Sequence, residues 1–97
     1  MRIRFTTKRL ADLYTSEKGA KRYPPEVVEG FFEVVAYLAA SVDERDLYAL
    51  KSLHYEKLQG REPERSLRLN KQWRLIIVIA TDDEGAIIDI VAIEDYH

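Results

Sequence analysis

The apolar residues of this chain follow a helical period in the first half and a strand period in the second half. Between residues 27 and 39 pairs of apolar residues return every three or four positions, which predicts a helix with one broad buried face. Pro24 and Pro25 precede this run, and proline fits the first turn of a helix. From Lys51 onward the period changes to two. A chain that changes period in this way is expected to fold as an α+β protein, with helices packed on a sheet.

The segments around this helix predict the remaining elements. Residues 2–5 alternate as a short strand, and Thr6 or Thr7 can cap a first helix that runs to about Lys18, with Gly19 as its C-cap. Residues 43–50 predict a short helical turn with Leu47 and Leu50 directed inward.

The second half of the chain predicts the sheet. Residues 73–80 are apolar on both faces after Arg74, which is typical of a central strand that is covered on both sides. Residues 81–85 form a turn, and residues 86–94 form the partnering strand. The expected architecture is an N-terminal strand and two helices packed on a mainly antiparallel sheet of four to five strands.

Chain length and residue types exclude several classes of protein. A chain of 97 residues has room for one domain with one core, so we expect residues 1–97 to form a single domain. No apolar run is long enough to span a membrane and the start lacks an apolar leader, so we expect a cytoplasmic protein without a membrane partner. Cysteine is absent, and only His54 and His97 supply imidazole. We therefore expect no cofactor and no metal site built by the protein.

Charge alternates strongly along the chain although the net charge is only −2. Residues 1–25, 26–50, 51–75 and 76–97 carry net charges of +5, −5, +4 and −6. If folding brings the first and third quarters together, they form a basic surface that suits an anionic partner. Ordinary mixed surface charge is the alternative.

The segment from Arg68 to Arg74 predicts a hairpin in which two arginines can meet. A three-residue loop of Asn70, Lys71 and Gln72 pairs Arg68 with Arg74 on one face of the sheet, whereas a two-residue loop puts them on opposite faces. Asn70 tolerates the left-handed conformation that such loops use. Two guanidiniums that face each other repel, which favours an anion such as phosphate between them. The alternative is that each arginine pairs with a nearby carboxylate.

Three segments in this order resemble a known family: residues 53–60 (LHYEKLQG), residues 66–76 (SLRLNKQWRLI) and the ending Asp95-Tyr96-His97. Together they are similar to the HigB-type toxins of the RelE/ParE toxin-antitoxin superfamily, and the similarity covers the whole chain. Gln59 and Arg65 depart from the family pattern, in which a lysine and an aromatic residue are common.

The resemblance implies a metal-independent endoribonuclease that enters the A site of the 70S ribosome and cleaves mRNA. It also implies a cognate HigA-like antitoxin with a helix-turn-helix domain. The catalytic residues it implies are His54, Arg68, Arg74, Asp95, Tyr96 and His97, and it also implies an RNA contact by Lys57. We expect Arg61, Arg65 and Lys71 to bind RNA together with Lys57. A gyrase-directed toxin of the ParE type is one alternative, and a decayed toxin that only binds its antitoxin is another.

These side chains suggest a mechanism, because RNA carries its own nucleophile and needs only a base, a cation and an acid. Arg68 and Arg74 are expected to stabilise the scissile phosphate. His54 and His97 share the proton transfers in an order that stays open. The roles expected for the others are orientation of a histidine by Asp95 and base stacking or positioning by Tyr96.

Overall fold

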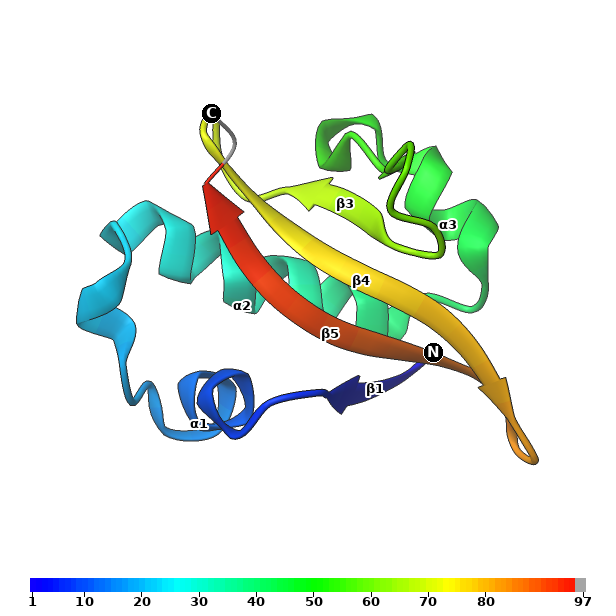
Figure 1. The fold of residues 1–97 in the computed structure, drawn as a ribbon, viewed down its shortest axis with the longest axis horizontal. Helices are drawn as coiled ribbons and strands as arrows, with labels where there is room; N and C mark the ends of the chain where they lie inside the picture. Colours follow the sequence, from blue (N-terminus) through cyan, green and yellow to red (C-terminus); the bar gives the residue numbers. More distant parts are fainter. Residues whose placement is uncertain (96–97) are drawn as a thin grey trace.

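The computed structural model describes residues 1–95, which form helices packed against a twisted sheet (Figure 1). The helices are α1 (Lys8–Ser16), α2 (Pro25–Ala40) and α3 (Glu44–Ala49), with short 3₁₀ helices η1 (Ala20–Arg22) and η2 (Lys51–Leu53). The strands are β1 (Arg2–Phe5), β2 (Glu56–Lys57), β3 (Arg65–Arg68), β4 (Trp73–Asp82) and β5 (Gly85–Asp95). No helix in residues 1–95 is long and apolar enough to cross a membrane.

The sheet has five strands in the order β1-β5-β4-β3-β2. Only β1 runs parallel to its neighbour, with Ile3 opposite Ile88, and the other three pairs are antiparallel. The long hairpin of β4 and β5 forms the centre of the molecule (Figure 1). The α+β fold and the mainly antiparallel sheet predicted from the sequence are therefore confirmed.

One face of the sheet packs against the helices and builds the core. Leu67, Leu75 and Ile77 belong to the same buried cluster as Phe31 of α2 and Leu47 of α3. Because side chains alternate along a strand, the residues between them point to the opposite face. Within residues 1–95, no helix covers that opposite face of the β4–β5 hairpin, which is turned towards the viewer in Figure 1.

β4 is covered on both sides only in its first half. Ile76 points to the face without helices and is nevertheless fully buried, whereas Val78 and Ala80 on that face are half-buried. The prediction of a strand covered on both sides thus holds near Ile76 and is wrong towards the β4–β5 turn.

Three local expectations meet different outcomes at the ends of the helices. The Thr7 hydroxyl caps α1 by accepting a hydrogen bond from the Leu10 amide at 3.2 Å, as predicted. The predicted end of α1 is wrong, because Glu17 takes the left-handed conformation (φ 57°) and Gly19 instead precedes η1. Leu50, predicted to point inward, is 38% exposed.

The arginines of β1 lie beside acidic residues of the last quarter of the chain. Arg2 pairs with Asp82, and Arg4 donates to the Asp89 carboxylate at 2.6 and 3.0 Å. Hydrogen bonds from Arg2 lower the pKa of Asp82 to about 2. Asp82 of β4 and Asp89 of β5 therefore neutralise two arginines that we expected in a basic surface.

A polar cluster fastens α3 to the edge of the sheet. The Glu44 carboxylate accepts hydrogen bonds from the Tyr55 hydroxyl at 2.7 Å and from Arg65 at 2.6 Å. The hydrogen bond from Tyr55, followed by the charge of Arg65, holds the pKa of Glu44 below its ordinary value. A carboxyl group with a lowered pKa stabilises the folded state above its unfolded-state pKa, and this contribution is lost as the pH falls through the folded-state pKa.

The variant Glu44→Gln is expected to lower the free energy of unfolding at pH 7 by about 1 kcal/mol, because Glu44 is partly exposed and solvent screens the pair. This corresponds to a fall in Tm of roughly 4–8 °C. Thermal denaturation followed by circular dichroism at decreasing pH measures it. The difference from the wild type should shrink in acid, whereas Glu29→Gln, at an exposed position on α2, should show no such pH dependence.

Candidate functional site

The β3–β4 hairpin places two arginines opposite each other, as predicted for the three-residue loop, the first of the two alternatives. Its loop has three residues, closed by a hydrogen bond from the Leu69 amide to the Trp73 carbonyl at 2.9 Å. Arg68 is the direct cross-strand partner of Arg74. Asn70 is not left-handed, since Glu17 and His54 are the only residues besides glycine with a positive φ in residues 1–95. Its carboxamide oxygen instead accepts from the amides of Gln72 and Trp73 at 2.9 and 2.8 Å.

Contacts with the helical layer hold this hairpin in place. The Trp73 ring meets Tyr23 edge to face, with ring centroids 5.7 Å apart. Gly30 lets α2 approach the hairpin so closely that a Cβ atom at this position would lie 2.8 Å from the Leu69 carbonyl oxygen. A glycine inside a helix is costly unless such close packing requires it.

We expect Gly30→Ala to destabilise the protein by about 1 kcal/mol, because overpacking against backbone outweighs the gain in helix propensity. Without the contact, the same change would stabilise α2 by about 1 kcal/mol. The sign of the change in urea unfolding therefore tests the contact. Ala36→Gly, at an exposed site of the same helix, calibrates the propensity effect and should destabilise by about 1 kcal/mol. A more stable Gly30→Ala protein would show that the hairpin does not depend on this contact.

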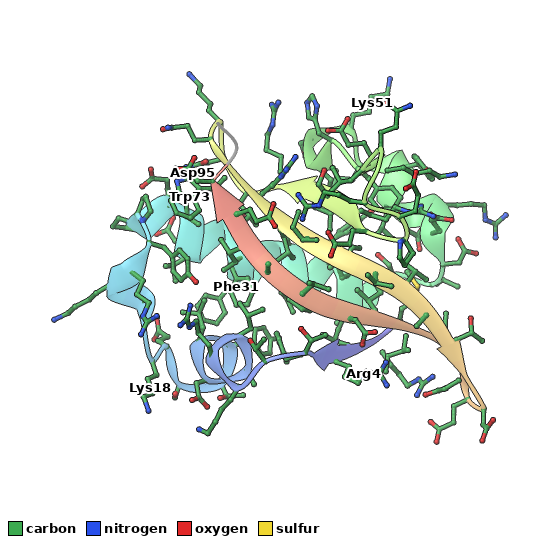
Figure 2. All side chains as sticks on the ribbon, in the orientation of Figure 1. Arg4, Lys18, Phe31, Lys51, Trp73 and Asp95 are labelled. Atoms are coloured by element: carbon green, nitrogen blue, oxygen red, sulfur yellow. The ribbon has the colours of Figure 1, made fainter. Side chains whose placement is uncertain are left out.

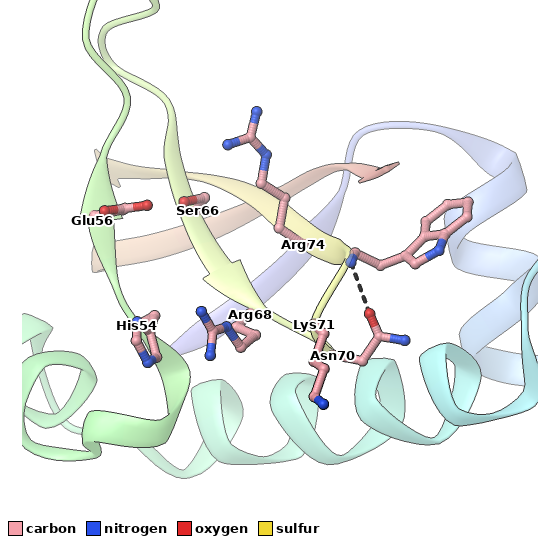
Figure 3. A pocket seen from close by; sticks show the side chains of 8 residues that line it. His54, Glu56, Ser66, Arg68, Asn70, Lys71 and Arg74 are labelled. Atoms are coloured by element: carbon pink, nitrogen blue, oxygen red, sulfur yellow. Dashed lines mark hydrogen bonds between the residues drawn. The ribbon is translucent and has the colours of Figure 1, made fainter. Parts of the chain in front are cut away.

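A small cavity opens beside the hairpin on the face of the sheet without helices (Figure 3). Its lining residues are His54, Glu56, Ser66, Arg68, Asn70, Lys71, Trp73 and Arg74. The cavity volume is about 110 Å³, below the roughly 300–1,000 Å³ typical of sites for whole small molecules. A cavity of this size suits one phosphate group, while the parts of the ligand attached to that phosphate lie outside.

His54 reaches this cavity through an unusual backbone conformation. It ends η2 in the left-handed region, with φ 48° and ψ 48°. Leu53 and Tyr55 on either side are buried and fix the chain, so the exposed histidine is held at the cavity. A left-handed conformation costs about 1 kcal/mol or more for a residue other than glycine, and such residues concentrate at functional sites.

The two arginines leave the hairpin in different directions. Figure 3 shows Arg68 extending towards His54, whereas Arg74 extends away from them. Arg74 lies 3.4 Å from a Glu94 carboxylate oxygen. Arg68 is exposed and forms no ion pair with any carboxylate of residues 1–95. Both interpretations of the arginine pair thus apply in part, because Arg74 has a carboxylate partner and Arg68 remains available to an anion.

Glu56 is a cavity residue that the sequence analysis missed. It is the cross-strand partner of Ser66, and both line the cavity (Figure 3). Glu56 is exposed and forms no ion pair within residues 1–95. The spacing of two between His54 and Glu56 gave no usable signal, because His54 is left-handed and the alternation of an extended strand does not apply to it.

Lys57 and Arg65, two of the predicted RNA-binding residues, are not brought to the cavity. They are cross-strand partners on the other side of the sheet edge. Arg65 binds Glu44 and the Tyr55 hydroxyl, and the charge of Lys57 also lowers the pKa of Glu44. Lys71, in contrast, lines the cavity from the hairpin loop.

Two of the remaining predicted residues lie in the loop before β3 and on β5, namely Arg61 and Asp95. Arg61 binds Glu64 and Glu94. Asp95 pairs with Trp73, and Figure 2 shows the two side by side at the end of the sheet. Tyr96 and His97 lie outside the described residues.

The cavity combines groups that can bind an anion and transfer protons. Arg68 offers a cation without a carboxylate partner in residues 1–95, while Glu56 and His54 offer a carboxylate and an imidazole. Groups of this kind can stabilise a phosphorane and exchange protons with its oxygens. Within residues 1–95, no cluster of three or more histidine, aspartate or glutamate side chains could hold a metal ion.

The comparisons with known proteins include a family model and a solved structure, and both are of toxins. A family model described as HigB-like toxin, "RelE-like toxin of type II toxin-antitoxin system HigB", matches residues 3–97. Among solved structures, the chain is similar to the "YoeB/ParE toxin from Agrobacterium tumefaciens", with a TM-score of 0.61 and 14% identity over 100% of both chains. At this identity the likeness establishes the fold alone. No curated protein sequence matches the chain significantly.

Proposed function

Because the chain belongs to the HigB-like family of RelE-like type II toxins, we propose that it is an endoribonuclease that cleaves mRNA in the ribosomal A site. The observation that carries this proposal is the cavity that Arg68 lines together with His54 and Glu56. A guanidinium without a carboxylate partner in residues 1–95 suits a phosphate, and the two neighbours supply proton transfer.

In the proposed reaction, Glu56 accepts the proton of the ribose 2′-hydroxyl, which attacks the adjacent phosphorus atom. Arg68 stabilises the negative charge of the pentacoordinate phosphorane. A histidine donates a proton to the departing 5′-oxygen, and His54 and His97 are the two candidates. The bond to the 5′-oxygen breaks, which leaves a 2′,3′-cyclic phosphate and a 5′-hydroxyl.

The RNA outside the cavity requires further contacts. Lys71 lines the cavity and is proposed to bind a phosphate of the flanking chain. Arg74 is the cross-strand partner of Glu94, and Asp95-Tyr96-His97 follow Glu94 in the sequence. We therefore extend the proposed site to Arg74 and to these three residues. Arg65 and Lys57 are not included, because Arg65 donates a hydrogen bond to Glu44 and the charge of Lys57 lowers the pKa of Glu44.

Membership in a type II toxin family implies an antitoxin partner. We propose that this partner is a HigA-like protein with a helix-turn-helix domain. The second proposed partner is the 70S ribosome with its bound mRNA, which places the reaction in the cytoplasm. The acidic residues exposed on α2, Glu26, Glu29 and Glu33, are available for contacts with the antitoxin.

Induced expression in a bacterial host tests the proposed function. We expect growth arrest together with mRNA ends inside coding regions, mapped by primer extension, and no arrest with the Arg68→Gln variant. Arrest with double-strand breaks in DNA and intact mRNA would contradict the nuclease and favour a gyrase-directed toxin. Normal growth at full expression would also contradict it and leave a protein that only binds its antitoxin.

A further inference from the structure

Glu94 lies between two arginines at the edge of the proposed site. It is the cross-strand partner of Arg74, which in turn is the partner of Arg68, so the three residues form a row across the sheet. Arg61 approaches the same carboxylate from the loop before β3, with its two terminal nitrogens 3.0 and 2.8 Å from the two oxygens.

The Glu94 carboxylate thereby has the geometry of a bound phosphate. Bidentate contacts from a guanidinium are the common way in which arginine holds either a carboxylate or a phosphate. Arg61 makes such contacts, and Arg74 adds a third at 3.4 Å. The hydrogen bonds from Arg61 lower the pKa of Glu94, so the carboxylate is charged at neutral pH.

Another anion can replace the Glu94 carboxylate between these arginines. The side chains of Arg61 and Glu94 are 39% and 31% exposed, and ion pairs with this much solvent contact contribute little net free energy. A phosphodiester that reached the same place would offer both arginines an equivalent pair of oxygens. The row from Arg68 to Arg61 would then hold two successive phosphates.

Resting on the proposed function, we propose that Glu94 is a positioning residue that takes the place of an RNA phosphate. In the RNA-free protein it holds Arg74 and Arg61 ready at the site. When RNA binds, the phosphate next to the one at Arg68 displaces the carboxylate and is bound by the two arginines. Glu94 thus keeps the site ordered while weakening its affinity for RNA in general.

The test measures binding of a short 2′-O-methylated single-stranded RNA, which cannot be cleaved, by fluorescence anisotropy at several salt concentrations. Glu94→Gln should bind roughly three- to ten-fold more tightly than the wild type, because the Glu94 carboxylate no longer competes with phosphate for the two arginines. The slope of log K against log salt should steepen by about 0.7 for each arginine that gains a phosphate. Glu62→Gln, in the same loop as Arg61 and without an ion pair in residues 1–95, removes the same charge and should change neither value appreciably.

Two further variants separate exchange from a general effect of charge or folding. Glu94→Asp keeps the charge but shortens the side chain, so it should also tighten binding while remaining folded. In the Arg61→Gln background, Glu94→Gln should have a smaller effect, because Glu94 then competes with phosphate for one arginine instead of two. Equal affinity and slope for Glu94→Gln and Glu62→Gln would overturn the inference, even if the wild type cleaves mRNA. Absence of RNA binding by every variant would overturn the proposed function together with it.

Discussion

Replacement of Arg68 by glutamine is expected to lower the rate of mRNA cleavage by roughly 100- to 1,000-fold, the usual effect of removing one group that stabilises charge in a transition state. Arg68 is the cavity arginine without a carboxylate partner in residues 1–95, so a bound phosphate is the anion that it would serve. Its loss should weaken both RNA binding and the chemical step. Single-turnover cleavage of mRNA on programmed ribosomes measures the rate, and binding is measured separately.

The control for this variant is Arg9→Gln, which removes the same charge from an exposed position on α1. It should cleave at nearly the wild-type rate. Because Arg68 is exposed and forms no ion pair in residues 1–95, its replacement should leave the thermal unfolding curve almost unchanged. Cleavage by Arg68→Gln at the rate of the Arg9→Gln control would remove Arg68 from the mechanism.

Replacement of Glu56 by glutamine is expected to slow cleavage by about 100- to 10,000-fold, the range that a positioned general base contributes. The amide keeps the shape of the side chain but cannot accept the proton of the 2′-hydroxyl. Binding of RNA should be unchanged or tighter, because a negative charge leaves the cavity. This combination distinguishes Glu56 from Arg68, whose loss is expected to weaken binding as well.

The matched variants for Glu56 are Glu56→Asp and Glu62→Gln. Aspartate retains the carboxylate at a changed distance and should recover part of the lost rate. Glu62→Gln removes an exposed carboxylate that does not line the cavity and should cleave normally. If Glu56→Gln also cleaved normally, the base would have to be a histidine, and His54→Ala would then carry the large loss.

Much of the fold follows from local patterns in the sequence. The helix over residues 27–39 was predicted because its apolar spacing survives in any tertiary context, and α2 indeed buries Val27, Phe31 and Leu38. The hairpin loop was predicted as one of two lengths, and the pairing of Arg68 with Arg74 followed from the longer one. Local prediction was less accurate at helix ends, where Glu17 rather than Gly19 takes the left-handed position after α1.

The pairing of charges shows what local patterns leave open. The alternating quarters of charge predicted a basic surface from residues 1–25 and 51–75. In the structure Arg2 and Arg4 lie on β1, where Arg4 pairs with Asp89 of the parallel strand β5 and Arg2 pairs with Asp82 at the end of β4. The order of strands decides which charges meet, and this order depends on packing between segments that are far apart in the chain.

For the candidate site, the sequence by itself determined the inventory: a histidine at residue 54, two arginines on one hairpin and the ending Asp95-Tyr96-His97. Only the tertiary structure decided which of these residues come together. The register of β2 against β3 places Glu56 in the cavity and turns Lys57 towards Glu44, because neighbours along a strand point to opposite faces. The register of β4 against β5 gives Arg74 a carboxylate partner in Glu94, while Arg68 forms no ion pair within residues 1–95. β2 and β3 are not joined by a tight turn, and β4 and β5 shift register between Ile76 and Ile77, so loop length alone does not fix either register.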